Sequence, residues 1–415
     1  MGKNRKTVPK GFRYRNCDDF AAYLNHMARL GWHFKEWRAG LVFEKGKPED
    51  AVYALEVFTK ADETDLRPLP ETEEFAAYCE AAGWKFVDAW QKFVVFKRIR
   101  EDAVPILTDR ERLENVIKAE KPFIWYPLVH CTLWFGMKLS EFSFLFPQRI
   151  FSPQALSMVA FWGMLLLLTA LQAVQFLLWK RRCHRRLDRG LSLFFGKSQS
   201  DKWYHWGYLL IGAGYCVSIV LSGSPLLGYI YLSYVLALML LSFLLGKLRP
   251  DSNTAGLIQL LGSIAIVVGI CFAAFYGDQA QKQAHKEIPE PPLTYGDMGI
   301  TMELEKTKSF RQEQSIFGTW QYFSLDYGDD YLYYHLYTTD VPWVLDGLWK
   351  EETDGRVNET RDDCTDAWDA EEAFRNYAGN YLVRYGDAIW VICPSMEESL
   401  TQEQIDLAIA AIRGD

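Results

Sequence analysis

The feature that most constrains this chain is an uncharged apolar segment from Ala155 to Trp179, followed at once by the basic sequence KRRCHRRLDR. A helix of that length crosses a hydrocarbon core of roughly 30 Å. Basic residues directly after such a helix favour the cytosolic side of the membrane. The segment therefore predicts an integral membrane protein and a transmembrane helix whose carboxyl end faces the cytosol.

Residues 122–276 are expected to form about five transmembrane helices. Their predicted ranges are 122–142, 155–179, 203–222, 225–246 and 255–276. The first is short, but the loop Lys180–Lys202 contains eight Lys or Arg residues and is expected in the cytosol, as is the N-terminus, which leads into no secretory signal. Two crossings must then precede this loop. The prediction is a multi-pass cell-membrane protein with a cytosolic N-terminus and an extracytoplasmic C-terminus.

Charge is distributed unevenly along the chain. Residues 1–276 carry 34 Lys and Arg against 25 Asp and Glu, whereas residues 277–415 carry 11 against 28. A basic part fits contact with anionic headgroups of a lipid bilayer, and an acidic part fits a soluble domain on the other face. Simple solubility, together with the preference for positive charge on the inner side, explains the same distribution.

Residues 11–100 contain an internal duplication. The recurring motifs are Phe20-Ala21-Ala22-Tyr23 with Phe75-Ala76-Ala77-Tyr78, Gly31-Trp32-His33-Phe34 with Gly83-Trp84-Lys85-Phe86, and LVFEK at 41–45 with FVVFK at 93–97. In each copy a strand, at Phe12–Arg15 or Val52–Phe58, is expected to precede an amphipathic helix that ends at a glycine, and two strands follow. The sequence thus predicts a cytosolic α+β domain, residues 1–105, of two strand-helix-strand-strand repeats.

The tryptophans of the repeats have two interpretations. Trp32 and Trp84 occupy the same place in both copies, which indicates that they pack a helix against a sheet. The alternative is a groove for a small molecule or peptide between the copies, lined by Trp37 and Trp90. After the repeats, a capping box at Thr108-Asp109-Arg110-Glu111 predicts a connecting amphipathic helix over residues 106–121.

This N-terminal part resembles a known family. The residues that carry the resemblance are Tyr23, Leu24, Met27, Gly31-Trp32, Phe43-Glu44-Lys45-Gly46, Tyr53, Gly83-Trp84 and Phe96-Lys97. They are similar to the domain of unknown function 2812 family, whose members are mainly uncharacterised membrane proteins of Gram-positive bacteria. The resemblance implies membrane helices behind the N-terminal domain and genes that often lie beside PadR-type transcriptional regulators. It implies no biochemical activity.

Residues 277–293 read as a polar, Pro-rich linker, and residues 294–415 as an extracytoplasmic, acidic α+β domain. Strands are expected at Thr319–Asp326, Tyr331–Thr338 and Asn380–Ile392, and helices at Asp369–Tyr377 and Thr401–Ile412. The aspartates of this domain could suggest calcium, but their spacing does not match an EF-hand, so a solvated acidic face explains them. The predicted fold class is a multi-domain membrane protein with α+β domains at both ends.

No catalytic, cofactor-binding or metal-ligating constellation is recognisable, and no cofactor is expected. The chain has no GxSxG, Walker or HExxH sequence, and the four longer predicted spans contain no Asp, Glu, Lys or Arg, which disfavours ion transport. We therefore expect a protein that is not an enzyme. Small residues four apart, at Ala265, Gly269 and Ala273, indicate close helix packing within the chain or in a homo-oligomer.

Cys364 and Cys393 are the two cysteines of the predicted outer domain. Because that side of the membrane is oxidising, they could form a disulfide that stabilises a small domain. Equally, Cys393 lies within an apolar run and could be a buried core thiol. Both interpretations remain open from the sequence.

The favoured function is a membrane-spanning regulatory or signalling protein that senses with its outer domain and binds a cytosolic regulator through its N-terminal domain. The expected partners are the lipid bilayer and a cytosolic transcriptional regulator, without direct nucleic-acid binding. The alternative is an accessory or structural subunit of a membrane complex such as an exporter. A membrane enzyme with an unrecognised site is the third, weakest hypothesis.

Overall fold

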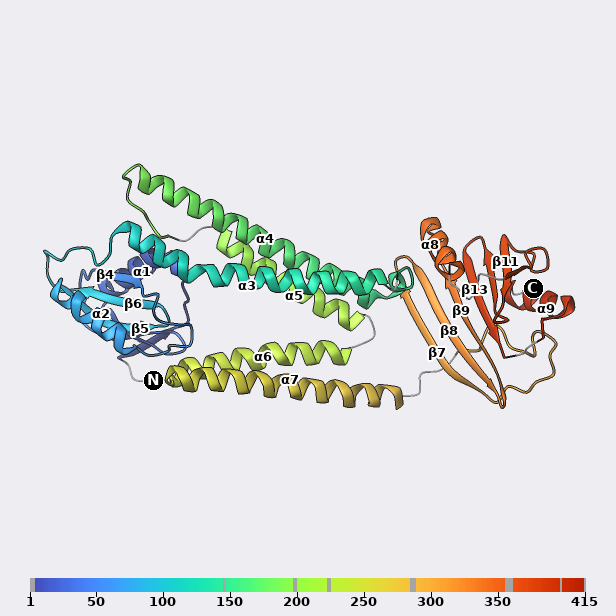
Figure 1. Cartoon of the computed structure of the whole chain (residues 1–415). Helices are drawn as coiled ribbons and strands as arrows, with labels where there is room; N and C mark the ends of the chain where they lie inside the picture. The colour runs from blue at the N-terminus through green and yellow to red at the C-terminus, as the bar shows by residue number, and fades with distance from the viewer. Residues whose placement is uncertain are drawn as a thin grey trace. The chain divides into compact units, whose positions relative to one another are not determined.

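The computed structural model describes residues 4–144, 146–196, 200–221, 225–283, 289–354, 361–395 and 398–413. The chain forms two compact units (Figure 1). The first comprises Met1–Phe135 and Phe161–Gln279, and the second comprises Gly136–Ala160 and Ala280–Asp415. Each unit therefore combines a folded domain with parts of the long helices.

The N-terminal domain contains two copies of one strand-helix-strand-strand unit. The first copy consists of β1 (Arg5–Val8), a 3-10 turn η1 (Tyr14–Asn16), α1 (Cys17–Arg29), β2 (Trp32–Trp37) and β3 (Leu41–Lys45). The second consists of β4 (Tyr53–Val57), α2 (Pro70–Ala81), β5 (Trp84–Trp90) and β6 (Phe93–Arg98). Their antiparallel sheets have the strand orders β1-β3-β2 and β4-β6-β5. The strand that follows the helix, β2 or β5, is therefore an edge strand in each copy.

The two copies share detailed backbone features, which confirms the duplication. Gly31 and Gly83 have positive φ angles of 76° and 94° directly after their helices, a conformation that a residue with a side chain would rarely adopt. β2 and β5 each contain a register shift directly before a carboxylate residue, between Phe34 and Glu36 in β2 and between Phe86 and Asp88 in β5. The predicted first strand, however, was misplaced, because β1 is Arg5–Val8 and the aromatic segment after it enters η1.

Five long helices follow the repeats. They are α3 (Asp109–Phe144), α4 (Pro153–Asp188), α5 (Ser200–Leu221), α6 (Pro225–Leu248) and α7 (Ser252–Gln283), with a 3-10 turn η2 (Gln148–Phe151) between α3 and α4. The predicted connecting helix and first membrane span are one continuous helix, α3, although it contains Pro122 and Pro127. The structure thus corrects the boundary expected near residue 121.

Two helical segments among the described residues are long and apolar enough to cross a membrane, rather than the expected five. They are Pro153–Asp188 and Ser252–Gly269, while Trp206–Val217 and Val235–Leu248 are shorter apolar stretches. α3 is not one of these two segments; its uncharged middle part, residues 122–137, is short and contains two prolines and His130. The side chains at the far ends of α5 and α7, including Ala273 of the small-residue pattern, lie outside the described residues.

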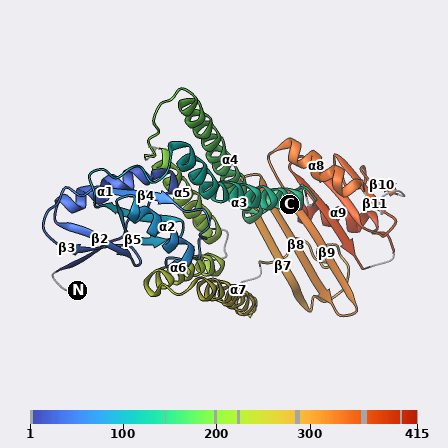
Figure 2. The same ribbon diagram turned by 60° about the vertical axis from the view of Figure 1, so that its left-hand side comes forward.

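The C-terminal domain is built on one seven-stranded antiparallel sheet (Figure 2). Its elements are β7 (Lys306–Ser315), β8 (Gly318–Tyr327), β9 (Asp330–Thr338), α8 (Pro342–Thr353), β10 (Arg361–Asp363), β11 (Glu372–Asn376), β12 (Tyr381–Tyr385), β13 (Ala388–Pro394) and α9 (Gln402–Arg413). The strand order is β10-β11-β12-β13-β9-β8-β7. The predicted helix at Asp369–Tyr377 is wrong, because this segment is a turn followed by β11.

Helices α8 and α9 cover opposite faces of this sheet. Leu345 and Leu348 of α8 pack with Tyr337 and Ile389, whereas Ile405 of α9 belongs to a second cluster that contains Tyr334 and Ile392. Alternate residues of a strand point to opposite faces, which is why Tyr334 and Tyr337 lie in different clusters. α8 covers the β11–β13 side of its face, and the β7–β9 side carries exposed and half-buried aromatic rings.

Candidate functional site

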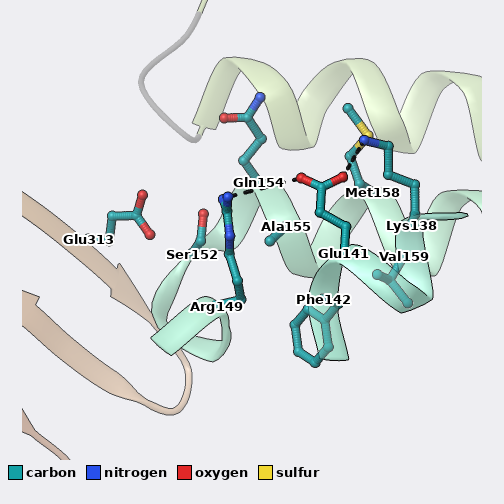
Figure 3. A pocket seen from close by; sticks show the side chains of 10 residues that line it. All are labelled: Lys138, Glu141, Phe142, Arg149, Ser152, Gln154, Ala155, Met158, Val159 and Glu313. Carbon is teal, nitrogen blue, oxygen red and sulfur yellow. Dashed lines mark hydrogen bonds and ion pairs between the residues drawn. The ribbon is translucent and has the colours of Figure 1, made fainter. Parts of the chain in front are cut away.

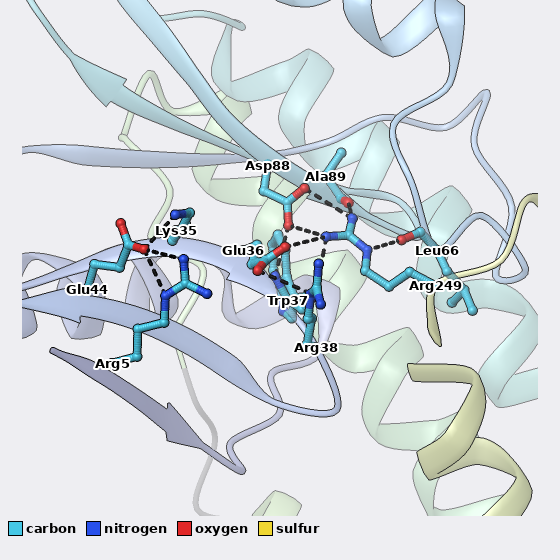
Figure 4. Close-up of polar contacts among 10 residues, drawn as sticks. All are labelled: Arg5, Lys35, Glu36, Trp37, Arg38, Glu44, Leu66, Asp88, Ala89 and Arg249. Carbon is cyan, nitrogen blue, oxygen red and sulfur yellow. Dashed lines mark hydrogen bonds and ion pairs between the residues drawn. The ribbon is translucent and has the colours of Figure 1, made fainter. Parts of the chain in front are cut away.

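Arg249 joins the turn between α6 and α7 to the seam between the two repeats (Figure 4). Its guanidinium makes a two-pronged contact with Asp88 of β5, from Nη1 to Oδ2 at 3.0 Å and from Nη2 to Oδ1 at 3.1 Å. It also donates to three backbone carbonyl groups, those of Leu66, Trp37 and Ala89. With the Arg249 and Asp88 side chains only 10% and 8% exposed, this is a buried and fully hydrogen-bonded ion pair.

The duplication supplies two carboxylates to this arginine, one from each copy. Asp88 and Glu36 follow equivalent register shifts in β5 and β2, and Glu36 lies 3.9 Å from the Arg249 guanidinium. Asp88 also accepts the Trp37 backbone N–H at 2.8 Å, which joins the two strands directly. Burial raises the pKa of Asp88, and the hydrogen bonds from Arg249 oppose that rise. We call Arg249, Asp88 and Glu36 the seam cluster.

Further contacts hold the α6–α7 turn on the N-terminal domain. The Ala39 N–H donates to the Gly246 carbonyl at 3.2 Å, and the Thr64 and Ser252 hydroxyls are 3.1 Å apart. The Arg249 guanidinium also lies over the Trp90 ring, at 5.6 Å from its centroid. The turn is therefore fixed to the domain by several independent interactions, with Arg249 at their centre.

A second buried arginine ties α3 to the same domain. Arg112 donates to Asp18 of α1 at 2.8 Å and to Glu56 of β4 at 3.1 Å. Asp18 in turn accepts the Phe195 N–H at 2.7 Å, which brings the segment after α4 to this point. Burial raises the pKa of Glu56 to about 7. Arg112 opposes this rise, and the negative charges of Asp18 and Asp109 add to it. The first turn of α3 is thus fixed by charge as well as by packing.

The connection between α3 and α4 packs into the C-terminal domain. Ile150 and Phe151 of η2 are 3% and 0% exposed and lie in the same cluster as Tyr337 and α8. The Ser315 hydroxyl donates to the Ile150 carbonyl at 2.7 Å. A cavity of about 160 Å³ beside this connection is lined by Lys138, Glu141 and Arg149 (Figure 3), but these charges pair with one another, at 2.7 Å for Lys138–Glu141 and 4.0 Å for Arg149–Glu141.

The β8–β9 part of the sheet presents an aromatic face. Its members are Trp320, Tyr322, Tyr331, Tyr333 and His335. His335 accepts a hydrogen bond from the Trp320 indole at 3.2 Å, and burial lowers the pKa of His335 to about 4, so that this ring is neutral at pH 7. A cavity of about 420 Å³ borders Trp320 and is also lined by Arg311. The face therefore offers stacked rings with charge at one edge.

Trp32 and Trp84 pack within the N-terminal domain, as the first of the two interpretations predicts. Trp84 is 7% exposed and donates to the Val104 carbonyl at 2.7 Å, and Trp32 packs on the core of the first copy. The alternative interpretation was a groove between the copies, lined by Trp37 and Trp90. In the structure the seam cluster lies between the copies, Trp37 is buried in the core, and the Trp90 ring lies against the Arg249 guanidinium. The sequence patterns described above did not single out Arg249. The duplicated carboxylates were the signal that could have found it.

The disulfide between Cys364 and Cys393 is not formed, since both are free thiols. Cys364 hydrogen-bonds through its backbone to Ala373 of β11, whereas Cys393 is on β13, with β12 between them. They also pack in different clusters, on opposite faces of the sheet. Two strand spacings alone separate β11 from β13 by about 10 Å, well beyond the reach of a disulfide. The core-thiol interpretation holds for Cys393, which is 4% exposed.

Within the described ranges, no group of three or more His, Cys, Asp or Glu side chains is placed to hold a metal ion. Several aspartates of the C-terminal domain have other roles. Asp330 accepts the Ser395 hydroxyl at 2.8 Å, and Asp369 pairs with Arg413 at 2.8 Å.

These features define a chain with a duplicated N-terminal α+β domain fixed to a set of long helices and a separate C-terminal α+β domain. Residues 16–129 match the family model described as Protein of unknown function (DUF2812). The match spans the first repeat from the end of η1 onward, the whole second repeat and the first part of α3, which confirms the resemblance found in the sequence. Neither a curated protein nor a solved structure matches the chain.

Proposed function

We propose that this protein is a membrane-spanning regulatory protein that carries a signal between its two folded domains through α3 and α4. The observation that supports this most directly is that each helix has one end in the core of each domain. Leu113 and Val116 of α3 and Trp179 of α4 pack in the N-terminal domain, while Phe142 of α3 and Leu156 of α4 pack in the C-terminal domain. In this proposal, a change in packing at one end of the helix pair alters the packing of the core at the other end.

The membrane arrangement is part of the same proposal. α3 and α4 each have 36 residues, and a straight helix of that length is about 54 Å long, which exceeds a hydrocarbon core of about 30 Å. We propose five crossings, by α3 to α7, with the N-terminal domain in the cytosol and the C-terminal domain outside. The strongly basic end of α4 and the net negative charge after residue 276 support this orientation.

In this proposal the aromatic face of β8–β9 is the sensing surface. Stacked rings favour a flat or apolar ligand group, and Arg311 at the edge favours a negatively charged one. The seam cluster is a second connection between the helices and the N-terminal domain in this proposal, because Arg249 lies in the turn between α6 and α7 and contacts both repeats. The N-terminal domain then binds a cytosolic transcriptional regulator.

The test is a transcript profile of the native host with the gene deleted. The expected result is a change in a small set of transcripts, restored by the wild-type gene and not by Asp88→Asn, which removes the charge that Arg249 contacts. The matched control is Glu44→Gln, whose carboxylate makes exposed ion pairs with Arg5 and Lys35 in the same domain. An unchanged profile after deletion would contradict the regulatory role.

An accessory role in a membrane complex is the second candidate. It is favoured by Gly214 of α5 and Gly269 of α7, where an added methyl group would meet no other described atom within 4 Å. Such open small-residue surfaces allow another helix to approach closely. Purification from native membranes separates the two candidates, since a transporter subunit among the bound proteins supports this role and a transcriptional regulator supports the first.

A further inference from the structure

A cavity of about 580 Å³ lies between the N-terminal domain and helices α3, α4 and α5, entirely within the first compact unit. Its volume is within the range of roughly 300–1,000 Å³ that is usual for small-molecule sites. The seam cluster does not line it. It is therefore a separate candidate site from the contacts described above.

The cavity has polar and aromatic side chains at the domain end, and apolar side chains together with Thr169, Gln172 and Tyr208 along the helices. At the domain end it is lined by Arg13 and Tyr14, and along the helices by Phe123, Cys131 and Leu165. On α3 the lining runs from Glu120 to Cys131, a distance of about 16 Å along a helix. A ligand with a polar head and an extended apolar chain fits this distribution.

Two side chains on the cavity wall have unused hydrogen-bond donors. Gln172 of α4 is 7% exposed, its Oε1 accepts the Tyr208 hydroxyl at 3.0 Å, and its Nε2 has no hydrogen-bond partner among the described residues. Arg13 is half-buried, and its guanidinium has no hydrogen-bond or ion-pair partner among the residues that the structure describes. A buried donor without a partner is unfavourable unless a ligand or water satisfies it.

The carboxylates on the wall are already engaged. Glu63 accepts hydrogen bonds from Lys92 at 2.8 Å and from the Tyr14 hydroxyl at 2.9 Å. Glu120 accepts the Arg15 backbone N–H at 3.2 Å. The groups that remain for a ligand are thus donors, and one of them is positively charged.

We propose that this cavity binds a single-chain amphiphile with a carboxylate head, such as a long-chain fatty acid. The head pairs with the Arg13 guanidinium, which can hold a carboxylate through two parallel hydrogen bonds. The chain lies against Phe123 and Leu165, and Gln172 Nε2 contacts the ligand between head and chain end. Such a ligand would sit where the N-terminal domain meets α3, α4 and α5 and would change how they pack.

The test is equilibrium binding of radiolabelled dodecanoate to the full-length protein in phosphatidylcholine nanodiscs. We expect saturable binding that unlabelled dodecanoate displaces better than dodecanol or dodecyltrimethylammonium. Arg13→Gln should weaken binding about tenfold or more, as expected for loss of a charge-assisted contact. Leu165→Trp should abolish it by filling the cavity.

The matched control is Leu167→Trp, at a position on α4 that is 62% exposed, which should bind like wild type. Absence of saturable binding to the wild type would overturn the proposal. So would equal displacement by the cationic amphiphile, which would assign the cavity to a lipophilic cation. If Leu165→Trp does not fold, the affinity of Arg13→Gln for dodecanoate is the test. Unchanged affinity of Arg13→Gln would contradict the carboxylate–arginine contact.

Discussion

Replacing Arg249 with Gln should release the α6–α7 turn from the N-terminal domain. The substitution removes the two contacts with Asp88 and leaves a carboxylate that is 8% exposed without its cation. Removal of one partner from a buried ion pair typically costs about 3–5 kcal/mol. The carbonyl groups of Leu66 and Ala89 would also lose their donor. We therefore expect about 3 kcal/mol or more of lost docking free energy.

Hydrogen exchange of the purified protein measures this loss locally. A loss of about 3 kcal/mol corresponds to a more than 100-fold rise in the population of the state in which the α6–α7 turn is separated from the N-terminal domain. Backbone amides of β2 and β5 that exchange through this opening should then exchange more than about 100-fold faster. The Trp37 amide, which donates to Asp88, is the most direct reporter. Lys247→Gln is the matched control, because Lys247 lies in the same turn, carries the same charge and is exposed.

The reasoning also predicts a specific double-variant result. Arg249→Gln combined with Asp88→Asn should cost less than the two single losses added together, since the second change removes the carboxylate that the first leaves unpaired. Exchange in Arg249→Gln that matches Lys247→Gln would refute the role assigned to the pair. Strictly additive losses would show that the two side chains act independently.

Three other predictions follow from the structure. The pKa of Glu56 is about 7 in the folded protein and 4.5 ordinarily, so the folded state binds this proton more tightly than the unfolded state does. The free energy of unfolding should therefore fall by roughly 3 kcal/mol between pH 4.5 and 7. Glu56→Gln should remove that part of the pH dependence of thermal unfolding. A fragment of residues 1–105 lacks the buried face of α3 and should unfold at lower temperature and less cooperatively in circular dichroism than residues 1–121, and equal melting of the two would contradict the packing of α3. Alkylation of the denatured protein without reductant should label both Cys364 and Cys393 in a mass spectrum, and labelling of neither would show a disulfide.

The sequence predicts the secondary structure of the N-terminal domain well because its helix and strand signals are local and occur in both repeats. The helix ends at Gly31 and Gly83 and the paired strands follow from turn chemistry and alternation, which act over a few residues. The repeated motifs then support each other. The family match over residues 16–129 falls on the same part of the chain.

Features that depend on distant residues were missed. The segment at 369–377 reads as a helix from its composition, but pairing with β10 and β12 makes part of it a strand. The sequence predicted a connecting helix that ends near residue 121, yet one helix, α3, continues through Pro122 and Pro127. The pairing of Arg249 with Asp88 joins residues 161 positions apart, so no local periodicity or turn motif predicts it.

The central claim, that the two folded domains lie on opposite sides of a membrane and communicate through the helices between them, is tested most directly by reporters fused at each end of the full-length chain. An alkaline phosphatase fused after Asp415 should be active and a green fluorescent protein there should be dark, whereas the opposite pair of results is expected at the N-terminus. Cytosolic behaviour of the reporters at both ends would contradict the account, because the C-terminal domain could then not sense the outside.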